Sequence, residues 1–144
     1  MARVTTYLSF NRQTEAAFQL YQSAFQTDFI GPIVRFGDGP PGPGQPPMPE
    51  ADKSLILHVA LPILAGHVLM GTDSTGAMGP ALNPGNNIYL NLEPDSRLET
   101  DRLFAALGAG GKIESPLAEM FWGAYWGSLT DRFGIHWMFN CTAK

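Results

Sequence analysis

The sequence is short of cysteine, of charge and of long apolar runs. Its single cysteine, Cys141, excludes an internal disulfide and a cysteine-based zinc site. No apolar run approaches the ~20 residues that span a bilayer, and the N-terminus lacks the pattern of a signal peptide. Only 15% of the residues are charged, with no basic cluster and a net charge of −4, which argues against a nucleic-acid or anionic-membrane surface. We therefore expect a cytoplasmic domain without nucleic-acid or membrane partners.

Apolar residues make up 44% of the 144 residues, enough for the core of one domain or of two fused small modules. A helix is predicted from Glu15 onward, where Ala17, Tyr21 and Ala24 fall on one face. A second helix is predicted after residues 94–96 and ends at the glycines of 108–111. Runs of β-branched and aromatic residues predict strands at 4–10, 29–36, 54–63, 67–72, 87–93, 112–120, 122–130 and 135–140.

The order of these predicted elements repeats. Each half has a strand, a helix and three further strands. We predict an α+β fold of two βαβββ modules, at 1–73 and 87–144, joined by a Gly/Pro/Asn-rich linker at 74–86. A ferredoxin-like sandwich is the competing fold, but it has four strands and the pattern predicts eight. A second Gly/Pro-rich segment, 37–49, is either a flap or docking segment or, the interpretation we favour, a plain connection.

Several segments carry a family resemblance. They are YLSFNRQTEAAFQLYQSAF (7–25), LHVAL (57–61), LMGTDS (69–74), GGKIESPL (110–117) and WGAYWGSLTDRFGIHWMFN (122–140). In this order they resemble the PhnB-like branch of the vicinal oxygen chelate superfamily, which includes glyoxalase I, extradiol dioxygenases and the bleomycin and fosfomycin resistance proteins. The resemblance implies two βαβββ modules whose curved sheets surround a cleft. It also implies a homodimer in which a second subunit completes or flanks that cleft.

Metal enzymes of this superfamily take one ligand from the first and one from the last strand of each module. The resemblance carries these positions onto Thr6, Met70 (or Leu69), Asn87 and Met138. Two thioethers, a hydroxyl and an amide suit no divalent metal, and a shift of one residue brings in no His, Asp or Glu. We therefore expect no glyoxalase-type metal site and no cofactor.

Some members of the branch are labelled 3-demethylubiquinone 3-methyltransferases. Methyl transfer from S-adenosylmethionine normally uses a doubly wound sheet with a Gly-rich first turn. The glycines of this chain, GAGG at 108–111, follow a predicted helix, where they serve to end it. The sequence therefore gives the methyltransferase label no support.

Alternation predicts which side chains face the cleft. Within 87–92 the apolar Ile88, Leu90 and Leu92 are expected to face the helix. In 135–140 we expect Ile135, Trp137 and Phe139 in the core. The side chains left for a ligand, together with one from the aromatic run 121–127, are Tyr89, Asn91, Trp122, Met138 and Asn140. The alternatives are that the polar positions meet solvent or a subunit, and that the aromatic run forms a hairpin core or a dimer interface.

These observations favour a protein that binds a small organic molecule of unknown identity. The alternative is a metal-independent enzyme, of lyase, isomerase or transferase type, with a histidine acid–base site at His58 or His136. His58 lies within an apolar run, where a histidine is more often a core residue. A third interpretation is a regulatory partner that docks another protein through its aromatic run.

Overall fold

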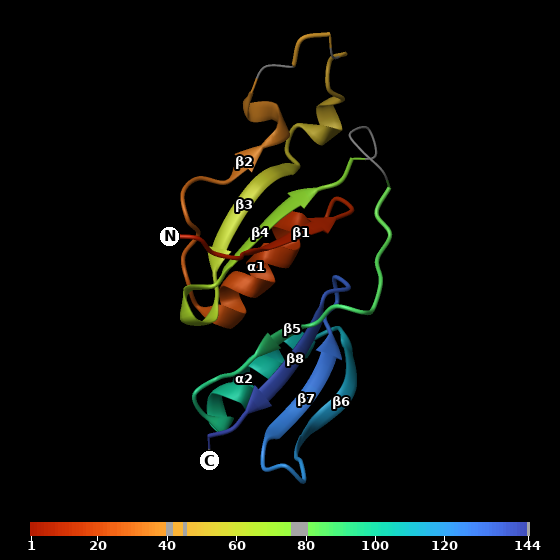
Figure 1. The fold of residues 1–144 in the computed structure, drawn as a ribbon. Coiled ribbons are helices and arrows are strands. Elements are labelled where there is room, and N and C mark those ends of the chain that lie inside the picture. Colours follow the sequence, from red (N-terminus) through yellow and green to blue (C-terminus); the bar gives the residue numbers. More distant parts are fainter. Residues whose placement is uncertain (40–41, 45, 76–80, 144) are drawn as a thin grey trace. The chain divides into compact units, whose positions relative to one another are not determined.

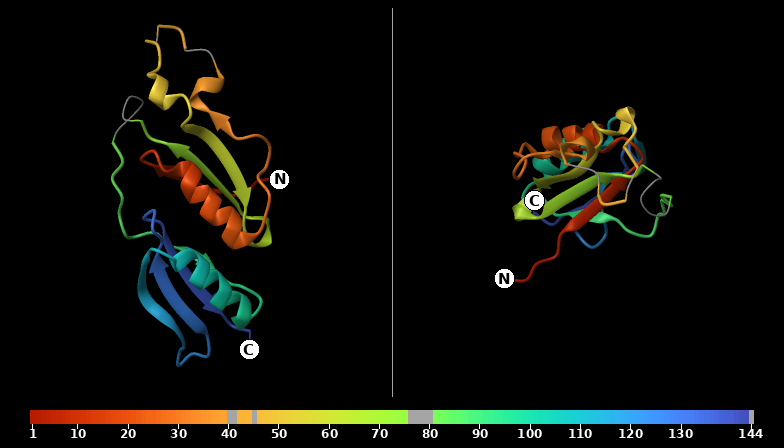
Figure 2. Two further views of the ribbon diagram at one scale, coloured as in Figure 1. Left: turned by 180° about the vertical axis from the view of Figure 1, so that it is seen from behind. Right: turned by 90° about the horizontal axis from the view of Figure 1, so that it is seen from above.

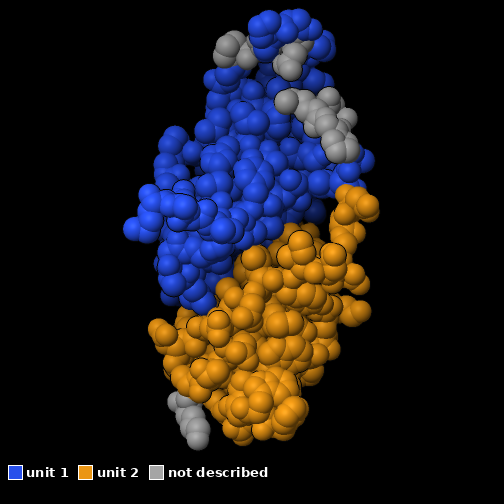
Figure 3. Space-filling model, in the orientation of Figure 1, with its two compact units in different colours: residues 1–82 blue, residues 83–144 orange. Residues whose placement is uncertain are grey.

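The computed structural model describes residues 1–39, 42–44, 46–75 and 81–143. Along the chain a strand, a helix and three strands follow one another, and the same order then repeats (Figures 1 and 2). The chain divides into two compact units, residues 1–82 and 83–144, which Figure 3 colours separately. The predicted α+β fold of two βαβββ modules is confirmed. The division falls inside the predicted linker 74–86, whose exact ends stay a prediction.

Unit 1 is a four-stranded mixed sheet with one helix on it. The strand order is β1-β4-β3-β2, with β1 parallel to β4 and the other pairs antiparallel. The helix packs on one face, because a Cβ added to Gly71 would meet Phe18 and Thr14 of that helix. The elements are β1 (Thr6–Phe10), α1 (Thr14–Phe25), β2 (Val34–Arg35), β3 (Ile56–Pro62) and β4 (Val68–Asp73).

Unit 2 repeats this arrangement, with strand order β5-β8-β7-β6 and β5 parallel to β8. Its helix begins at a standard cap, where the Ser96 hydroxyl accepts a hydrogen bond from the Glu99 N–H at 3.1 Å. Leu103 and Leu107 of that helix are fully buried. The elements are β5 (Leu90–Leu92), α2 (Arg97–Gly108), β6 (Lys112–Glu119), β7 (Tyr125–Thr130) and β8 (His136–Cys141).

The helix periodicity predicted for unit 1 is confirmed. Ala17, Phe18, Tyr21 and Ala24 are all buried, so one stripe of α1 forms the core of the unit with the strand residues beneath it. No helix within the described ranges is long and apolar enough to cross a bilayer.

Three predicted strands begin three or more residues later in the structure than expected. The strand predicted at 29–36 is reduced to Val34–Arg35, because Gly31 adopts φ +69° and Pro32 has no N–H to donate. The strand predicted at 122–130 starts only at Tyr125, after a turn in which Gly123 N–H donates to Met120 at 2.9 Å.

The strand predicted at 87–93 spans only Leu90–Leu92. Ile88 therefore lies outside it and is 75% exposed. The expectation that Ile88 faces the helix is wrong, since the alternation that would turn it inward begins two residues later.

Candidate functional site

The sheet of unit 2 has two faces of different character. Trp137, Phe139 and Leu129 are fully buried, and Phe104 of α2 contacts Phe139 edge to face at 5.2 Å. The alternate residues of β8, Met138 and Asn140, are half-buried on the opposite face. The predicted alternation along β8 is therefore confirmed. We call the side turned away from α2 the helix-free face of unit 2.

Strand register places several polar side chains side by side on this face. Asn91 of β5 pairs with Met138 of β8, and Met138 pairs with Ser128 of β7. Ser128 in turn pairs with Ser115 of the edge strand β6. The next row along consists of Asn140 and Trp126, which also pair with each other. Paired residues project to the same side of a sheet, so Met138 lies among four polar side chains and an indole. We call these six residues the Met138 cluster.

Beside the Met138 cluster lies a network whose hydrogen bonds are complete. The Tyr89 hydroxyl donates to both oxygens of Glu114, at 2.9 and 3.1 Å, and the Tyr89 ring lies 5.1 Å from that of His136. Hydrogen bonding to the carboxylate raises the pKa of Tyr89. His136 Nδ1 lies 2.7 Å from the Thr130 hydroxyl, and its Nε2 lies 2.7 Å from the Gly85 carbonyl oxygen. Both ring nitrogens of His136 are thus engaged.

The Met138 cluster differs from this network because its polar groups are unsatisfied. Within the described residues, the side chains of Asn91, Ser115, Ser128 and Asn140 make no hydrogen bond, and neither does the indole N–H of Trp126. Ser128 is only 5% exposed. Asn91 is exposed, and Ser115, Trp126 and Asn140 are half-buried. None of their polar atoms is among the buried side-chain atoms that lack a partner in the described chain, so these groups are open to solvent or to a ligand. The cluster therefore has free hydrogen-bonding capacity around an apolar thioether.

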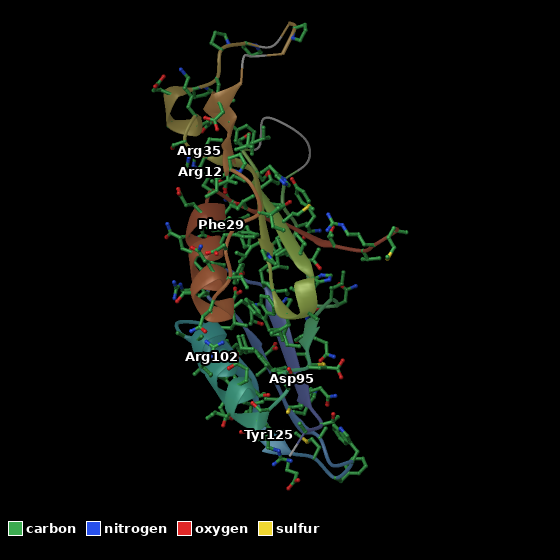
Figure 4. The ribbon with its side chains drawn as sticks, turned by 90° about the vertical axis from the view of Figure 1, so that its left-hand side faces the viewer. Arg12, Phe29, Arg35, Asp95, Arg102 and Tyr125 are labelled. Atoms are coloured by element: carbon green, nitrogen blue, oxygen red, sulfur yellow. The ribbon has the colours of Figure 1, made fainter. Side chains whose placement is uncertain are left out.

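The aromatic run 121–127 is distributed over three places. Phe121 and Trp122 lie in the turn before β7, 98% and 56% exposed, with their rings edge to face at 4.9 Å. Tyr125 lies on the α2 side (Figure 4), where its hydroxyl donates to Asp101 at 2.5 Å and Arg97 lies over its ring. Only Trp126 joins the helix-free face through the strand.

Five side chains were predicted from the sequence as ligand-binding. Asn91, Met138 and Asn140 lie together in the Met138 cluster, Tyr89 lies in the adjacent network, and Trp122 lies in the turn. Sequence reasoning missed Ser115, Trp126 and Ser128. Polar Ser128 and Thr130 alternate with apolar Leu129 in the sequence. Continued back along the strand, this alternation predicts Trp126 on the same face as Ser128.

The sheet of unit 1 also has a helix-free face. Tyr7 pairs with Met70 there, and Ser9 pairs with Thr72. His58 of β3 is half-buried on the same side, with its ring centroid 6.3 Å from that of Tyr7. This face thus combines a phenol, a thioether, two hydroxyls and an imidazole.

The positions carried over for metal ligands do not fit a divalent metal. Met70 and Met138 offer thioethers and Asn87 an amide. Thr6 pairs with fully buried Leu69, and its hydroxyl lies 2.9 Å from His67 Nε2. In the described part of the chain, no three His, Cys, Asp or Glu side chains form a group able to hold a metal ion.

A small groove lies elsewhere, on the α1 side of unit 1. Its volume is about 120 Å³, and it lies between α1, the segment containing Phe29 (Figure 4) and the β3 residues Ile56 and Val59. Pockets for drug-sized ligands span about 300–1,000 Å³. The groove is too small for such a ligand, and the polar capacity of the Met138 cluster is the stronger indication of a site.

Comparison with known proteins agrees with this fold. The family model described as 3-demethylubiquinone-9 3-methyltransferase matches residues 2–139. Protein YjdN of Escherichia coli is 28% identical over 142 residues, covering 95% of this chain and 93% of that protein. The crystal structure of protein PA1353 from Pseudomonas aeruginosa is 32% identical, covers all of both chains and superposes with a TM-score of 0.83.

Two further structures extend the likeness. A PhnB protein from Bacillus cereus, described as a 3-demethylubiquinone-9 3-methyltransferase, is 25% identical over 97% of this chain and 99% of that chain, with a TM-score of 0.74. A glyoxalase/bleomycin resistance protein/dioxygenase family enzyme from Burkholderia phytofirmans shares the fold at 16% identity and a TM-score of 0.59, over 95% of this chain and 97% of that one. The chain therefore belongs to the family described as 3-demethylubiquinone-9 3-methyltransferase, and it shares the fold of a glyoxalase/bleomycin resistance protein/dioxygenase family enzyme.

Proposed function

We propose that this protein binds a small, uncharged, flat organic molecule at the Met138 cluster. The observation that carries the proposal is the contrast within one sheet face. The network of Tyr89, Glu114, Thr130 and His136 satisfies its own hydrogen bonds, whereas the neighbouring polar side chains satisfy none of theirs. Apart from buried Ser128, these side chains are exposed or half-buried. A ligand that bonds to them takes the place of water and also gains apolar contact with Met138 and Trp126.

The side chains of the cluster indicate the kind of ligand. The amides of Asn91 and Asn140 each donate and accept, and the hydroxyls of Ser115 and Ser128 do the same. Trp126 and Met138 offer flat and adaptable apolar surface. None of the six side chains is charged, and Glu114 at the border is already bound to Tyr89. A charged ligand would lose its hydration without gaining a counter-charge, so a neutral heterocycle or amide is favoured.

The histidine-dependent enzyme is the second candidate. At His136 both nitrogens already have partners, which leaves no free lone pair for a substrate proton in this arrangement. The methyl transfer in the family's name gains no local support, since the glycines of 108–111 end α2 and Gly110 adopts φ +74° just beyond it. Binding without turnover is the function that the geometry favours. The acid–base candidate that remains is His58.

The experiment is native mass spectrometry of the freshly purified full chain, before and after incubation with an extract of neutral small metabolites. We expect an added organic mass on the wild type that is lost in Trp126→Leu and Ser128→Ala. Phe121→Leu, at a 98% exposed position, is the matched control and keeps the ligand. Loss of the added mass in Trp122→Leu would show that the turn before β7 also contacts the ligand. Equal retention by all variants, or no added mass on the wild type, would count against the site.

The same spectra test two further expectations. We propose a homodimer, as the family resemblance implies, and the subunit number is read directly from the native mass. Elemental analysis of the same sample tests the expectation that no metal is bound. Stoichiometric zinc, nickel, iron or manganese would overturn it.

A further inference from the structure

Two methionines occupy equivalent places in the two units. Met70 lies in β4, beside the first strand of unit 1, and Met138 lies in β8, beside the first strand of unit 2. Both side chains are half-buried, so neither is closed off from solvent. The two thioethers thus share their position in the repeat and their class of exposure. What differs between them is the set of neighbouring side chains.

The neighbours of Met138 are hydrogen-bond donors. Asn91 and Ser128 pair with it, one on each side. Across the antiparallel pair the Cβ atoms of such partners are about 4.5–5.5 Å apart, and the diagonal neighbour Trp126 is about 7–8 Å away, within reach of a long side chain. Asn140 follows two residues along β8. An amide N–H, a hydroxyl and an indole N–H thus lie around the thioether, and none has a partner in the described chain.

The neighbours of Met70 are less polar. On one side Met70 pairs with Ala60, whose side chain is a methyl group, and on the other side it pairs with Tyr7. Thr72, two residues along β4, already donates its hydroxyl to the Ile56 carbonyl at 3.4 Å. Met70 is therefore flanked directly by one donor, whereas Met138 is flanked directly by two.

This difference matters if the sulfur is oxidised. Oxidation to the sulfoxide converts methionine from an apolar side chain into a polar one. The thioether sulfur is only a weak acceptor, whereas the sulfoxide oxygen is a strong one. At Met138 that oxygen would lie among the unused donors of the Met138 cluster. Oxidation there would create hydrogen bonds on the sheet face that the reduced protein lacks, and it would use the donors that the proposed ligand needs.

We propose that Met138 is a modification site, at which oxidation by a peroxide releases the ligand of the Met138 cluster; this inference rests on the proposed function. A lone pair of the sulfur attacks one peroxide oxygen. The S–O bond forms, the O–O bond breaks, and the departing hydroxide takes the proton of the transferred oxygen to become water. Sulfur loses two electrons and the peroxide gains them. The sulfoxide oxygen then accepts hydrogen bonds from Asn91, Ser128 or Trp126, and the ligand loses these partners.

The first test needs no ligand. The full chain, labelled with ¹³C-methyl methionine and ¹⁵N, is treated with hydrogen peroxide and followed by nuclear magnetic resonance. We expect the methyl signal of Met138, assigned with Met138→Leu, to reach its sulfoxide position before that of Met70, assigned with Met70→Leu, because donors around the sulfur stabilise the oxygen as it transfers. The indole N–H signal of Trp126 and the side-chain amide signals of Asn91 are expected to move as they bond to the sulfoxide. The indole of Trp137, already bonded to Asp131, is the internal reference.

The second test follows the organic mass that the wild type carries in native mass spectra. Peroxide treatment is expected to lower its occupancy about tenfold or more, and methionine sulfoxide reductase, which reverses the modification, is expected to restore it. Met70→Leu is the matched variant and is expected to respond to peroxide as the wild type does. Met138→Leu is expected to keep through the treatment whatever mass it carries. Met138→Gln, whose amide oxygen imitates the sulfoxide, is expected to lack the mass without any peroxide.

The two tests separate this proposal from the proposed function. Oxidation of Met70 ahead of Met138, or indole and amide signals of Trp126 and Asn91 that stay unchanged once Met138 is oxidised, would overturn the modification site whether or not a ligand is found. An organic mass that survives complete oxidation of Met138 would overturn the modification site and leave the proposed function standing. A wild type without any organic mass would count against the proposed function, and the release of a ligand would fall with it.

Discussion

Gly71 of β4 provides the space that the ring of Phe18 occupies on α1. A Cβ at this position would collide with Cε1 of Phe18 and lie 3.1 Å from Cγ2 of Thr14. Both α1 residues are almost completely buried, so neither can move away into solvent. The close approach of helix and sheet in unit 1 therefore depends on a glycine whose φ is ordinary and whose lack of a side chain is what matters.

We predict that Gly71→Ala lowers the free energy of unfolding by about 1–3 kcal/mol, the usual cost of overpacking a core. Gly39→Ala is the matched control, since Gly39 has no heavy atom near its Cβ position and a negative φ of −120°. The control is expected to stay within ~0.5 kcal/mol of the wild type. Urea denaturation followed by circular dichroism measures both, and equal stability of the two variants would contradict the packing argument.

A second prediction concerns Asp73, the buried carboxylate at the end of β4. One of its oxygens accepts the Thr14 N–H at 3.0 Å and the Thr14 hydroxyl at 2.8 Å, and the other accepts the Ile56 N–H at 2.8 Å. Asp73 thereby caps α1 in place of Gln13, whose side chain makes no cap hydrogen bond. It joins the helix to two strands of the sheet.

Asp73→Asn replaces one acceptor oxygen with an NH₂ group that cannot accept these hydrogen bonds. We expect a loss of about 2–4 kcal/mol, because a buried N–H is left without a partner. Thr14→Ser keeps the hydroxyl and is expected to cost less than Asp73→Asn. Chemical denaturation of the wild type and the two variants measures their unfolding free energies. An Asp73→Asn variant as stable as the wild type would contradict the role of Asp73 as the helix cap.

Much of this architecture could be predicted from the sequence because local patterns of apolar and polar residues determine most of its helices and strands. The stripe of Ala17, Tyr21 and Ala24 predicted α1, and the repeat of element order predicted the two units. The ends of strands were harder to predict, because pairing decides them. Ile88 fits an apolar alternation but lies before the first ladder pair of β5, at Leu90.

The candidate site was predictable only in part, for the same reason. Alternation within β8 placed Met138 and Asn140 correctly, since both lie in one regular strand. Trp126 was not singled out, because the start of β7 depends on the turn at Gly123, which has φ +92°. Hydrogen-bond partners across strands, such as Gly85 for His136, are set by the tertiary fold and leave no trace in local sequence.

A third prediction concerns the ion pair between Arg35 of β2 and Glu15 of α1. Arg35 donates to both oxygens of Glu15, at 3.1 and 2.7 Å, and to the Ser54 carbonyl at 2.6 Å. Hydrogen bonding to Arg35 lowers the pKa of Glu15. A carboxyl whose pKa is lowered in the folded state stabilises the fold above its unfolded pKa, and this stabilisation is lost as pH falls through the folded pKa.

Glu15→Gln is therefore expected to cost less than about 1 kcal/mol at neutral pH, since both partners are well exposed and screened by solvent. The difference from the wild type is expected to vanish in acid, below the folded pKa of Glu15. Glu93→Gln, at an exposed position with no ion pair in the described chain, is the control. Urea midpoints across the acid range measure the effect, and a difference that grows in acid would contradict the sign.

The fourth prediction concerns the tautomer of His136. The Gly85 carbonyl oxygen 2.7 Å from Nε2 can only accept, so Nε2 carries the hydrogen and, in the neutral ring, Nδ1 accepts from the Thr130 hydroxyl. We expect a long-range proton–nitrogen spectrum to show the Nε2–H form. Thr130→Val removes the donor to Nδ1 and is expected to leave Nε2–H in place, because the Gly85 bond persists. A dominant Nδ1–H form in the wild type would show that the segment before β5 is not held by this ring.

The last prediction concerns Tyr89, whose hydroxyl donates to the exposed carboxylate of Glu114. Ionising the phenol would remove that hydrogen bond and set two negative charges side by side, which is why the pKa of Tyr89 is raised. Glu114→Gln is expected to bring this pKa down toward the ordinary tyrosine value. The ring-carbon signal of Tyr89, assigned with Tyr89→Phe, measures it in an alkaline titration of ¹³C-tyrosine-labelled protein. Glu119→Gln is the matched control on the same strand, because Glu119 pairs with Arg97 instead, and a shift of Tyr89 as large in this control as in Glu114→Gln would show that general charge, and not the hydrogen bond, sets the pKa.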